Sequence, residues 1–258
     1  QNEKRLEVAR QWAKDSKPRT YAQKMARAEQ ARALRRGDRR DEAIAMLEAD
    51  AMKVEAEGNQ TAYGNELTWL YSFYRGEQYS YGSRDPNAAK DSAERAMEIA
   101  ETLLKLAEGR EGRSVSVWGD VLVPHAAKIR YRKAGSYTST YYLNMDERID
   151  FLNRARGVFA WHSGVQSDAA FEPARLHYGN DAWPQALGAF RDYLSTKHFE
   201  PGSVVSRYDR EFISPSDWID RQVEAQFRVG QILQKELNKP DEAIVEYQTY
   251  VREFGLAN

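Results

Sequence analysis

The spacing of apolar residues constrains this chain more than any other feature of its sequence. In one segment, Ile44, Leu47, Ala51 and Val54 follow one another at steps of three, four and three residues. Such steps place side chains on one face of an α-helix, whereas a half-buried strand requires strict alternation. No convincing alternation of strand length competes with the helical spacing. The sequence therefore predicts an all-α fold.

Helix boundaries are expected where glycine, proline and capping residues separate the apolar stretches. Pro86 in a first turn and Gly109 after a last turn predict the clearest helix of the chain. Gly119 and Pro124 are expected to interrupt a less regular segment, 115–133. Further helices are expected at 17–36, 41–57, 62–75, 145–159, 169–177, 183–198, 215–237 and 240–254, with loops at 135–143 and 199–214.

Several carboxylates and amides stand where helix amides lack partners. Asn144 is expected to cap one helix, and Asp38 or Asp41 is expected to cap another. Asp146 and Glu147 belong to a first turn, where the helix dipole favours negative charge. These positions explain the carboxylates without a catalytic role.

Composition removes several classes of protein. Hydrophobic residues make up 41% of the 258 residues and charged residues 30%, which is typical of a folded, charge-coated chain. The absence of cysteine excludes disulfides, thiolate metal sites and a cysteine nucleophile. No apolar run approaches the roughly 18 residues that a membrane-spanning helix needs.

No motif for catalysis, metal or cofactor binding is present. The four histidines, at 125, 162, 177 and 198, include no pair at the helical spacing of a two-histidine metal site. A glycine-rich phosphate loop and a Gly-x-Ser-x-Gly nucleophile motif are also missing. We therefore expect a protein that is not an enzyme, with no catalytic residues, no metal and no cofactor.

The net charge of −1 conceals a change of sign along the chain. Residues 1–40 carry thirteen basic and five acidic side chains, and residues 41–100 carry five basic and twelve acidic ones. One hypothesis is that this basic segment binds nucleic acid or an anionic surface through contacts with phosphates. Its interspersed acids and its acidic neighbour favour the other interpretation, in which successive helices complement each other's charge. Nucleic acid is accordingly not the expected partner.

In the C-terminal stretch 223–254, Gly230 and Leu233 precede the turn Lys239-Pro240-Asp241, and Ala243 and Tyr247 follow it. This pattern resembles a tetratricopeptide repeat. Small residues such as Gly230 and Ala243 would let two helices approach closely, while Tyr247, with Tyr250, would fill the groove toward a neighbouring pair.

The resemblance extends only partly along the chain. The alanine of the motif recurs at 43, 93, 186 and 243, separated by 50, 93 and 57 residues, which are not multiples of the family's regular period. The resemblance thus implies an irregular α-solenoid of antiparallel helical hairpins. We expect one such domain over 1–258, with possible sub-blocks 1–109 and 115–258.

The resemblance implies that the protein is a scaffold that binds another protein. Its concave face, lined by the first helix of each pair, would hold an extended or helical partner segment. The polar positions implied to face inward are Glu224, Gln231 and Gln234 in the last repeat and, by looser analogy, Asn65, Thr68 and Arg75.

Two alternatives remain open at this point. The chain could be a structural subunit or segment of a larger assembly, such as one of the cell envelope. It could instead be an all-α enzyme domain acting on glycans, with acids near the loops 79–85 and 198–210. The absence of an initiator Met, together with a likeness of the last hairpin to repeats of bacterial envelope assembly proteins, favours a periplasmic or secreted product over a cytoplasmic one.

Overall fold

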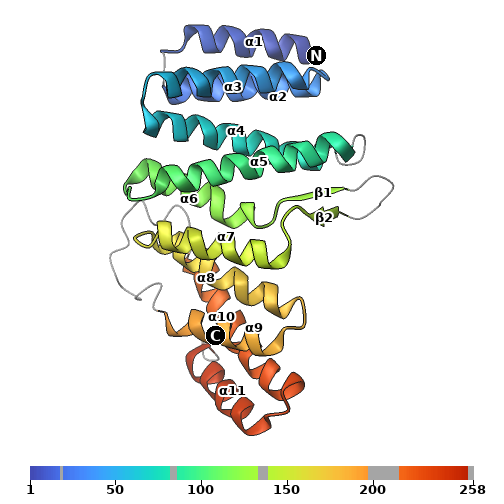
Figure 1. The fold of residues 1–258 in the computed structure, drawn as a ribbon, viewed down its shortest axis with the longest axis vertical. Coiled ribbons are helices and arrows are strands. Elements are labelled where there is room, and N and C mark those ends of the chain that lie inside the picture. Colours follow the sequence, from blue (N-terminus) through green and yellow to red (C-terminus); the bar gives the residue numbers. More distant parts are fainter. Residues whose placement is uncertain (18–19, 82–85, 133–138, 197–214, 255–258) are drawn as a thin grey trace. The chain divides into compact units, whose positions relative to one another are not determined.

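A computed structural model describes residues 1–17, 20–81, 86–132, 139–196 and 215–254. These residues form eleven α-helices, a short π-helical segment and two short strands (Figure 1). The prediction of an all-α fold is therefore confirmed. Among the helices described, none is both long and apolar enough to cross a membrane. The expected loop at 199–214 lies outside the described residues.

The chain divides into two compact units. The first contains Gln1–Leu106 and Tyr131–Thr140, and the second contains Ala107–Arg130 and Tyr141–Asn258. The helices of the first unit are α1 (Asn2–Asp15), α2 (Tyr21–Arg36), α3 (Arg40–Ala56), α4 (Gln60–Tyr81) and α5 (Pro86–Ala107, which reaches the boundary). Successive helices from α1 to α4 pack on one another (Figure 1). Helix α5 is joined to α3 by a hydrogen bond of 2.8 Å from Arg40 to Ser92.

Two boundaries of the first unit differ from expectation. Helix α1 was not predicted, and it buries only Leu6 and Ala9. Neither expected aspartate caps α3: Arg39 occupies the N-cap position, and Asp41 lies in the first turn. Asp38 instead adopts a left-handed backbone, with φ of 59°, in the turn after Gly37. A short polar side chain tolerates that conformation better than most residues do.

The second unit continues the pairing of neighbours along the chain. Helix α8 packs against α7 and α9, and α10 packs against α9 and α11. Its helical elements are α6 (Arg113–Ala126), α7 (Met145–Val158), α8 (Ser163–Tyr178), α9 (Trp183–Ser195), α10 (Pro215–Gln231), the π-helical η2 (Ile232–Glu236) and α11 (Pro240–Phe254). Its core includes the ring of Phe171, which lies 6.0 Å from Phe190 and 5.0 Å from Tyr193 between centroids.

Helix α6 corrects the expectation that Gly119 and Pro124 interrupt the segment. The helix runs through Gly119 without interruption. Close packing explains the glycine, since a Cβ atom there would lie 2.8 Å from Val165 and 3.0 Å from Phe159. Pro124 falls in the last turn, so the backbone hydrogen bond that it removes is near the helix end.

A small strand pair is the second correction. Strands β1 (Arg130–Arg132) and β2 (Ser139–Tyr141) form a two-stranded sheet, and β2 lies within the segment expected to be a loop. Three residues are too few for alternation to be recognised in a sequence. The sheet leaves the fold class unchanged.

The cap predicted for α7 is confirmed. Asn144 Oδ1 accepts a hydrogen bond of 3.0 Å from the Glu147 amide, and the Glu147 carboxylate accepts one of 2.7 Å from the Asn144 amide. This reciprocal arrangement satisfies two amides that the helix itself cannot pair.

The recurring alanines are buried in both units. Ala43, Ala93 and Ala186 have no exposed surface, and Ala243 is 1% exposed. A side chain of this size lets neighbouring helix backbones approach closely, which supports the expectation that small residues mark the packing sites.

Gly230 and Tyr247 show the same principle in the last hairpin. A Cβ atom on Gly230 would lie 2.5 Å from Cε1 of Tyr247, so the ring occupies the space that the glycine leaves. The ring of Tyr247 also lies 6.1 Å from that of Phe227, and its hydroxyl donates to Gln234 at 3.1 Å. Tyr247 therefore packs on the first helix of its own hairpin. The resemblance had implied that it fills the groove toward a neighbouring pair.

We expect Gly230→Ala to lower the free energy of unfolding by about 1–2 kcal/mol, because overpacking outweighs the gain in helix propensity. Gly188→Ala in α9 is the matched control, since a Cβ atom there would meet nothing within 4 Å. The control should raise stability by up to about 1 kcal/mol. Urea denaturation of both variants measures the difference, and equal effects would contradict the packing argument.

Candidate functional site

Helices α1–α4 of the first unit line a groove of about 770 Å³. Its α2 residues run from Gln23 to Arg35, so the groove follows this helix over twelve residue steps. At 1.5 Å per residue, that is about 18 Å. The groove is thus elongated, and helices that are consecutive in sequence provide all of its walls.

A buried glutamine fixes the wall formed by α1 and α2. Gln30 is 5% exposed, and its Nε2 donates a hydrogen bond of 3.1 Å to the carbonyl oxygen of Ala9. Its Oε1 accepts a bond of 3.2 Å from Arg27. Arg27 in turn donates to both carboxylate oxygens of Asp50 in α3, at 2.6 and 2.7 Å. One chain of hydrogen bonds therefore joins three helices around the groove.

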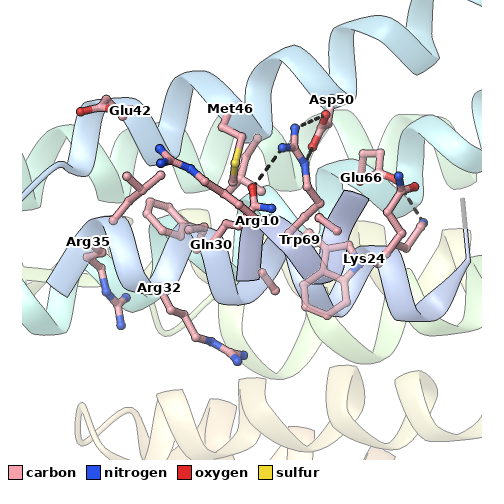
Figure 2. Close-up of a pocket in the computed structure, with 18 of the residues that line it drawn as sticks. Arg10, Lys24, Gln30, Arg32, Arg35, Glu42, Met46, Asp50, Glu66 and Trp69 are labelled. Carbon is pink, nitrogen blue, oxygen red and sulfur yellow. Dashed lines mark hydrogen bonds and ion pairs between the residues drawn. The ribbon is translucent and has the colours of Figure 1, made fainter. Parts of the chain in front are cut away.

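A second ion pair joins α2 to α4. Lys24 Nζ lies 3.1 Å from Glu66 Oε1, with both side chains about one-fifth exposed. Figure 2 shows this pair near Trp69, and the ion pair of Arg27 at Asp50. These contacts agree with the interpretation that the basic segment complements the charge of the acidic helices that follow it.

Positive charge nevertheless remains in excess along the groove. Four acidic residues line it, against seven basic ones, which gives a net charge of +3. The basic lining residues are Arg10, Lys14, Lys24, Arg27, Arg32, Arg35 and Lys53. Within the described residues, Arg10, Lys14 and Lys53 are exposed and take part in no hydrogen bond or ion pair. The groove can therefore attract a negatively charged ligand.

Glu42 is an acidic group at the same groove. Hydrogen bonds from Arg39 to its carboxylate hold the pKa of Glu42 below its ordinary value, and the charge of Arg10 acts in the same direction. Glu42 is consequently ionised at neutral pH and offsets part of the positive charge. The groove is thus mixed in sign, with the cations in the majority.

Half-buried apolar side chains accompany these charges. Met46 of α3 and Trp69 of α4 both line the groove and are both partly exposed. The Arg35 guanidinium lies 5.9 Å from the centroid of the Phe73 ring, another lining residue. The groove therefore offers apolar contact as well as charge.

The residues predicted on α4 do not line this groove. Thr68 is 8% exposed, and its hydroxyl donates a hydrogen bond of 2.8 Å to the Gly64 carbonyl oxygen. Asn65 and Arg75 are partly exposed but lie outside the lining. Their neighbours Glu66 and Trp69 form the groove side of α4 instead.

The residues predicted near the C-terminus belong to the second unit. Arg228 brings two of them together, because it donates a hydrogen bond of 2.9 Å to Gln231 and lies 3.8 Å from Glu224. Gln234 is exposed and accepts a hydrogen bond from Tyr247. Glu224 also lies 3.8 Å from Arg175 of α8. The predicted residues therefore fall into two separate groups, one in each unit.

Arginines are the polar residues that sequence reasoning missed in the second unit. Arg228 also stacks on Tyr178, with its Cζ 4.5 Å from the ring centroid, and donates to the Tyr178 hydroxyl at 2.9 Å. Arg221 pairs with Asp168 at 2.5 Å, while burial raises the pKa of Asp168 against the opposing effect of Arg221. A spacing of seven residues, two helical turns, places Arg221 and Arg228 on one side of α10, and this signal was present in the sequence.

The histidines that the structure describes have local roles. His162 is 3% exposed and caps α8, since its Nδ1 accepts a hydrogen bond of 3.2 Å from the Val165 amide. Burial lowers the pKa of His177. Among the described residues, no group of three or more histidine, aspartate and glutamate side chains could hold a metal ion. His198 lies outside this part of the chain, as do 82–85 and 198–210, where acids of a glycan-active site were envisaged.

Comparisons with known proteins add no identity to this geometry. No protein-family model matches the sequence, and a search of curated proteins also finds no match. The class that the fold defines is an all-α protein whose helices pack in adjacent pairs.

The Arg27–Asp50 pair yields a stability prediction. We expect Asp50→Asn to lower the free energy of unfolding by about 1 kcal/mol, because it weakens a two-pronged, half-buried ion pair and leaves Arg27 without its counter-charge. Thermal unfolding at low and high salt measures this loss, which should shrink as salt screens the pair.

Glu29→Gln is the control for this experiment. It removes the exposed pair between Glu29 and Arg32, one helical turn apart on α2. Exposed pairs of this kind contribute only about 0.3–0.5 kcal/mol. If Glu29→Gln lowered the free energy of unfolding as much as Asp50→Asn does, the Arg27–Asp50 pair would contribute no more to stability than an exposed pair.

Proposed function

We propose that this chain is a non-catalytic scaffold for protein–protein interaction, which binds a segment of another protein on the inner face of a tetratricopeptide-repeat-like helical array. The observation that carries the proposal is the groove along α2. It is open, elongated and lined by four consecutive helices, and it combines exposed charges with half-buried apolar side chains.

The dimensions of the groove favour a chain segment as the ligand. An extended segment of five or six residues spans about 18 Å, the length over which α2 lines the groove. Recognition of a linear segment by a groove between helices is a common mode of peptide binding.

The rigidity of the groove wall supports the same proposal. Gln30, Arg27 and Asp50 form a continuous set of hydrogen bonds across three helices. A wall that is already ordered loses little conformational entropy when a ligand binds. A partner segment would therefore bind without first reorganising the scaffold.

The polar residues of α10 and η2 are a second element of the proposal. Glu224, Gln231 and Gln234 are at least partly exposed, and Arg228 and Tyr247 hold them in place. We propose that they contact a further part of the partner. In the first unit, we propose that Asn65 and Arg75 also contact the partner. The burial of Thr68 argues against direct contact by its side chain.

Site-specific crosslinking tests the proposal. A photoreactive amino acid that replaces Ser72, a lining residue of α4, should crosslink in native extract to one defined segment of one partner. Mass spectrometry would identify that segment. The control replaces Lys105, an exposed residue of α5 outside the groove, and should not capture the same peptide.

Two outcomes would count against the scaffold. One is the same crosslinked peptides from both positions, which indicates contact without a site. The other is no crosslinked protein at all from Ser72 in extracts where the chain is folded.

Charge reversal gives an independent prediction for the sequence-derived residues. The double variant Arg75→Glu and Glu224→Lys should retain less of the crosslinked partner in a pulldown, while its Tm stays within a few degrees of that of the original chain. Loss of partner together with a large fall in Tm would indicate unfolding instead of lost contacts.

A further inference from the structure

The groove along α2 also indicates what kind of segment it binds. We infer that its ligand is a short acidic segment of a partner protein, with aspartate or glutamate side chains on either side of an apolar residue. This inference rests on the proposed function and adds the chemistry of the ligand to it.

The charge of the groove carries the first step. The lining has a net charge of +3, whereas the whole chain has −1, so positive charge is concentrated at this site. Complementary charge speeds association and selects among partners more than it adds affinity. A partner segment with carboxylates is thus the one that such a groove selects.

The second step of the inference is that some cations of the groove have carboxylate partners and others do not. Lys24 and Arg27 already have carboxylate partners in α4 and α3. Arg10, Lys14 and Lys53 are exposed and lack such partners in the described part of the chain. A ligand's carboxylates could therefore pair with these three cations without breaking an ion pair or side-chain hydrogen bond of the scaffold.

Apolar lining residues carry the third step. Met46 and Trp69 are partly exposed in the groove, and a ligand that presented charge alone would leave them in contact with water. Methionine adapts its shape to different apolar groups, and tryptophan offers a large rigid surface. An apolar side chain between the ligand's acidic ones would cover them.

The same features argue against nucleic acid as the ligand. Four acidic residues line the groove, among them Glu42, whose lowered pKa keeps it ionised. A phosphate backbone carries charge at every nucleotide and would pass close to these carboxylates. A peptide can place its acids opposite the cations and its neutral residues opposite the carboxylates.

The test begins with an array of short soluble peptides that contains acidic, basic and neutral members in equal numbers. We expect the full chain to retain peptides that combine Asp or Glu with Leu, Phe, Met or Trp. The tightest of these then serves as a labelled probe for fluorescence anisotropy, with a single-stranded oligodeoxythymidine as the nucleic-acid arm.

Two sets of variants should change affinity in opposite directions. Arg10→Gln, Lys14→Gln and Lys53→Gln together should weaken binding of the probe about tenfold, since each exposed charge pair contributes up to roughly fivefold. Asp50→Asn with Glu66→Gln should strengthen it about threefold, because these substitutions release Arg27 and Lys24 for the ligand. A variant that merely damaged the fold could not tighten binding.

The matched control removes the same number of charges elsewhere in the first unit. Lys4→Gln, Lys90→Gln and Lys105→Gln replace exposed lysines that do not line the groove. This variant should bind the probe within about twofold of the original chain, as distant surface charges are largely screened at physiological salt.

Several results would overturn the inference. They are retention of peptides without enrichment in Asp or Glu, retention of none above background, equal effects of the groove and control triple variants, and tighter binding of the oligonucleotide than of any peptide. The crosslink from Ser72 separates this inference from the proposed function. If that crosslink identifies a neutral or basic segment, the scaffold stands and only the acidic ligand is wrong.

Discussion

Close approach of neighbouring helices through small side chains is the constraint on which this structure depends. Ala43, Ala93, Ala186 and Ala243 are all buried, and Gly230 leaves room for a tyrosine ring. Close packing of this kind places helices that are consecutive in sequence side by side. It also fixes the distance over which charged side chains on adjacent helices can meet.

The charge distribution of the first unit becomes intelligible from that packing. Helix α2 belongs to the basic segment, and the acidic helices α3 and α4 lie close enough for Asp50 and Glu66 to pair with it. Additional hydrogen bonds offset the loss of hydration in partly buried ion pairs, and Arg27 donates one to Gln30. The cations in excess of these pairs account for the net positive charge of the groove lining.

The helices could be predicted from the sequence, whereas the groove could not, for physical reasons. Apolar spacing and caps depend on a few neighbouring residues, so α3, α5 and the cap at Asn144 could be inferred locally. Gly119 misled because its role depends on Val165 and Phe159, which are distant in sequence. The side of α4 that lines the groove is also beyond local inference: adjacent positions such as Thr68 and Trp69 point about 100° apart, and only the placement of α1 and α2 shows which side is open.

Stability and ligand attraction are opposed at this groove. The carboxylates of Asp50 and Glu66 hold the helices together, and the same carboxylates reduce the positive charge available to a ligand. A groove optimised for anion binding alone would lack them and would leave Lys24 and Arg27 partly buried without counter-charges, at a cost in stability. Because Arg10, Lys14 and Lys53 stand outside this conflict, they are the positions at which affinity can change without altering the fold. The division of the cations into a paired set and an exposed set would therefore let one part of the chain serve packing and, in the proposed scaffold, recognition as well.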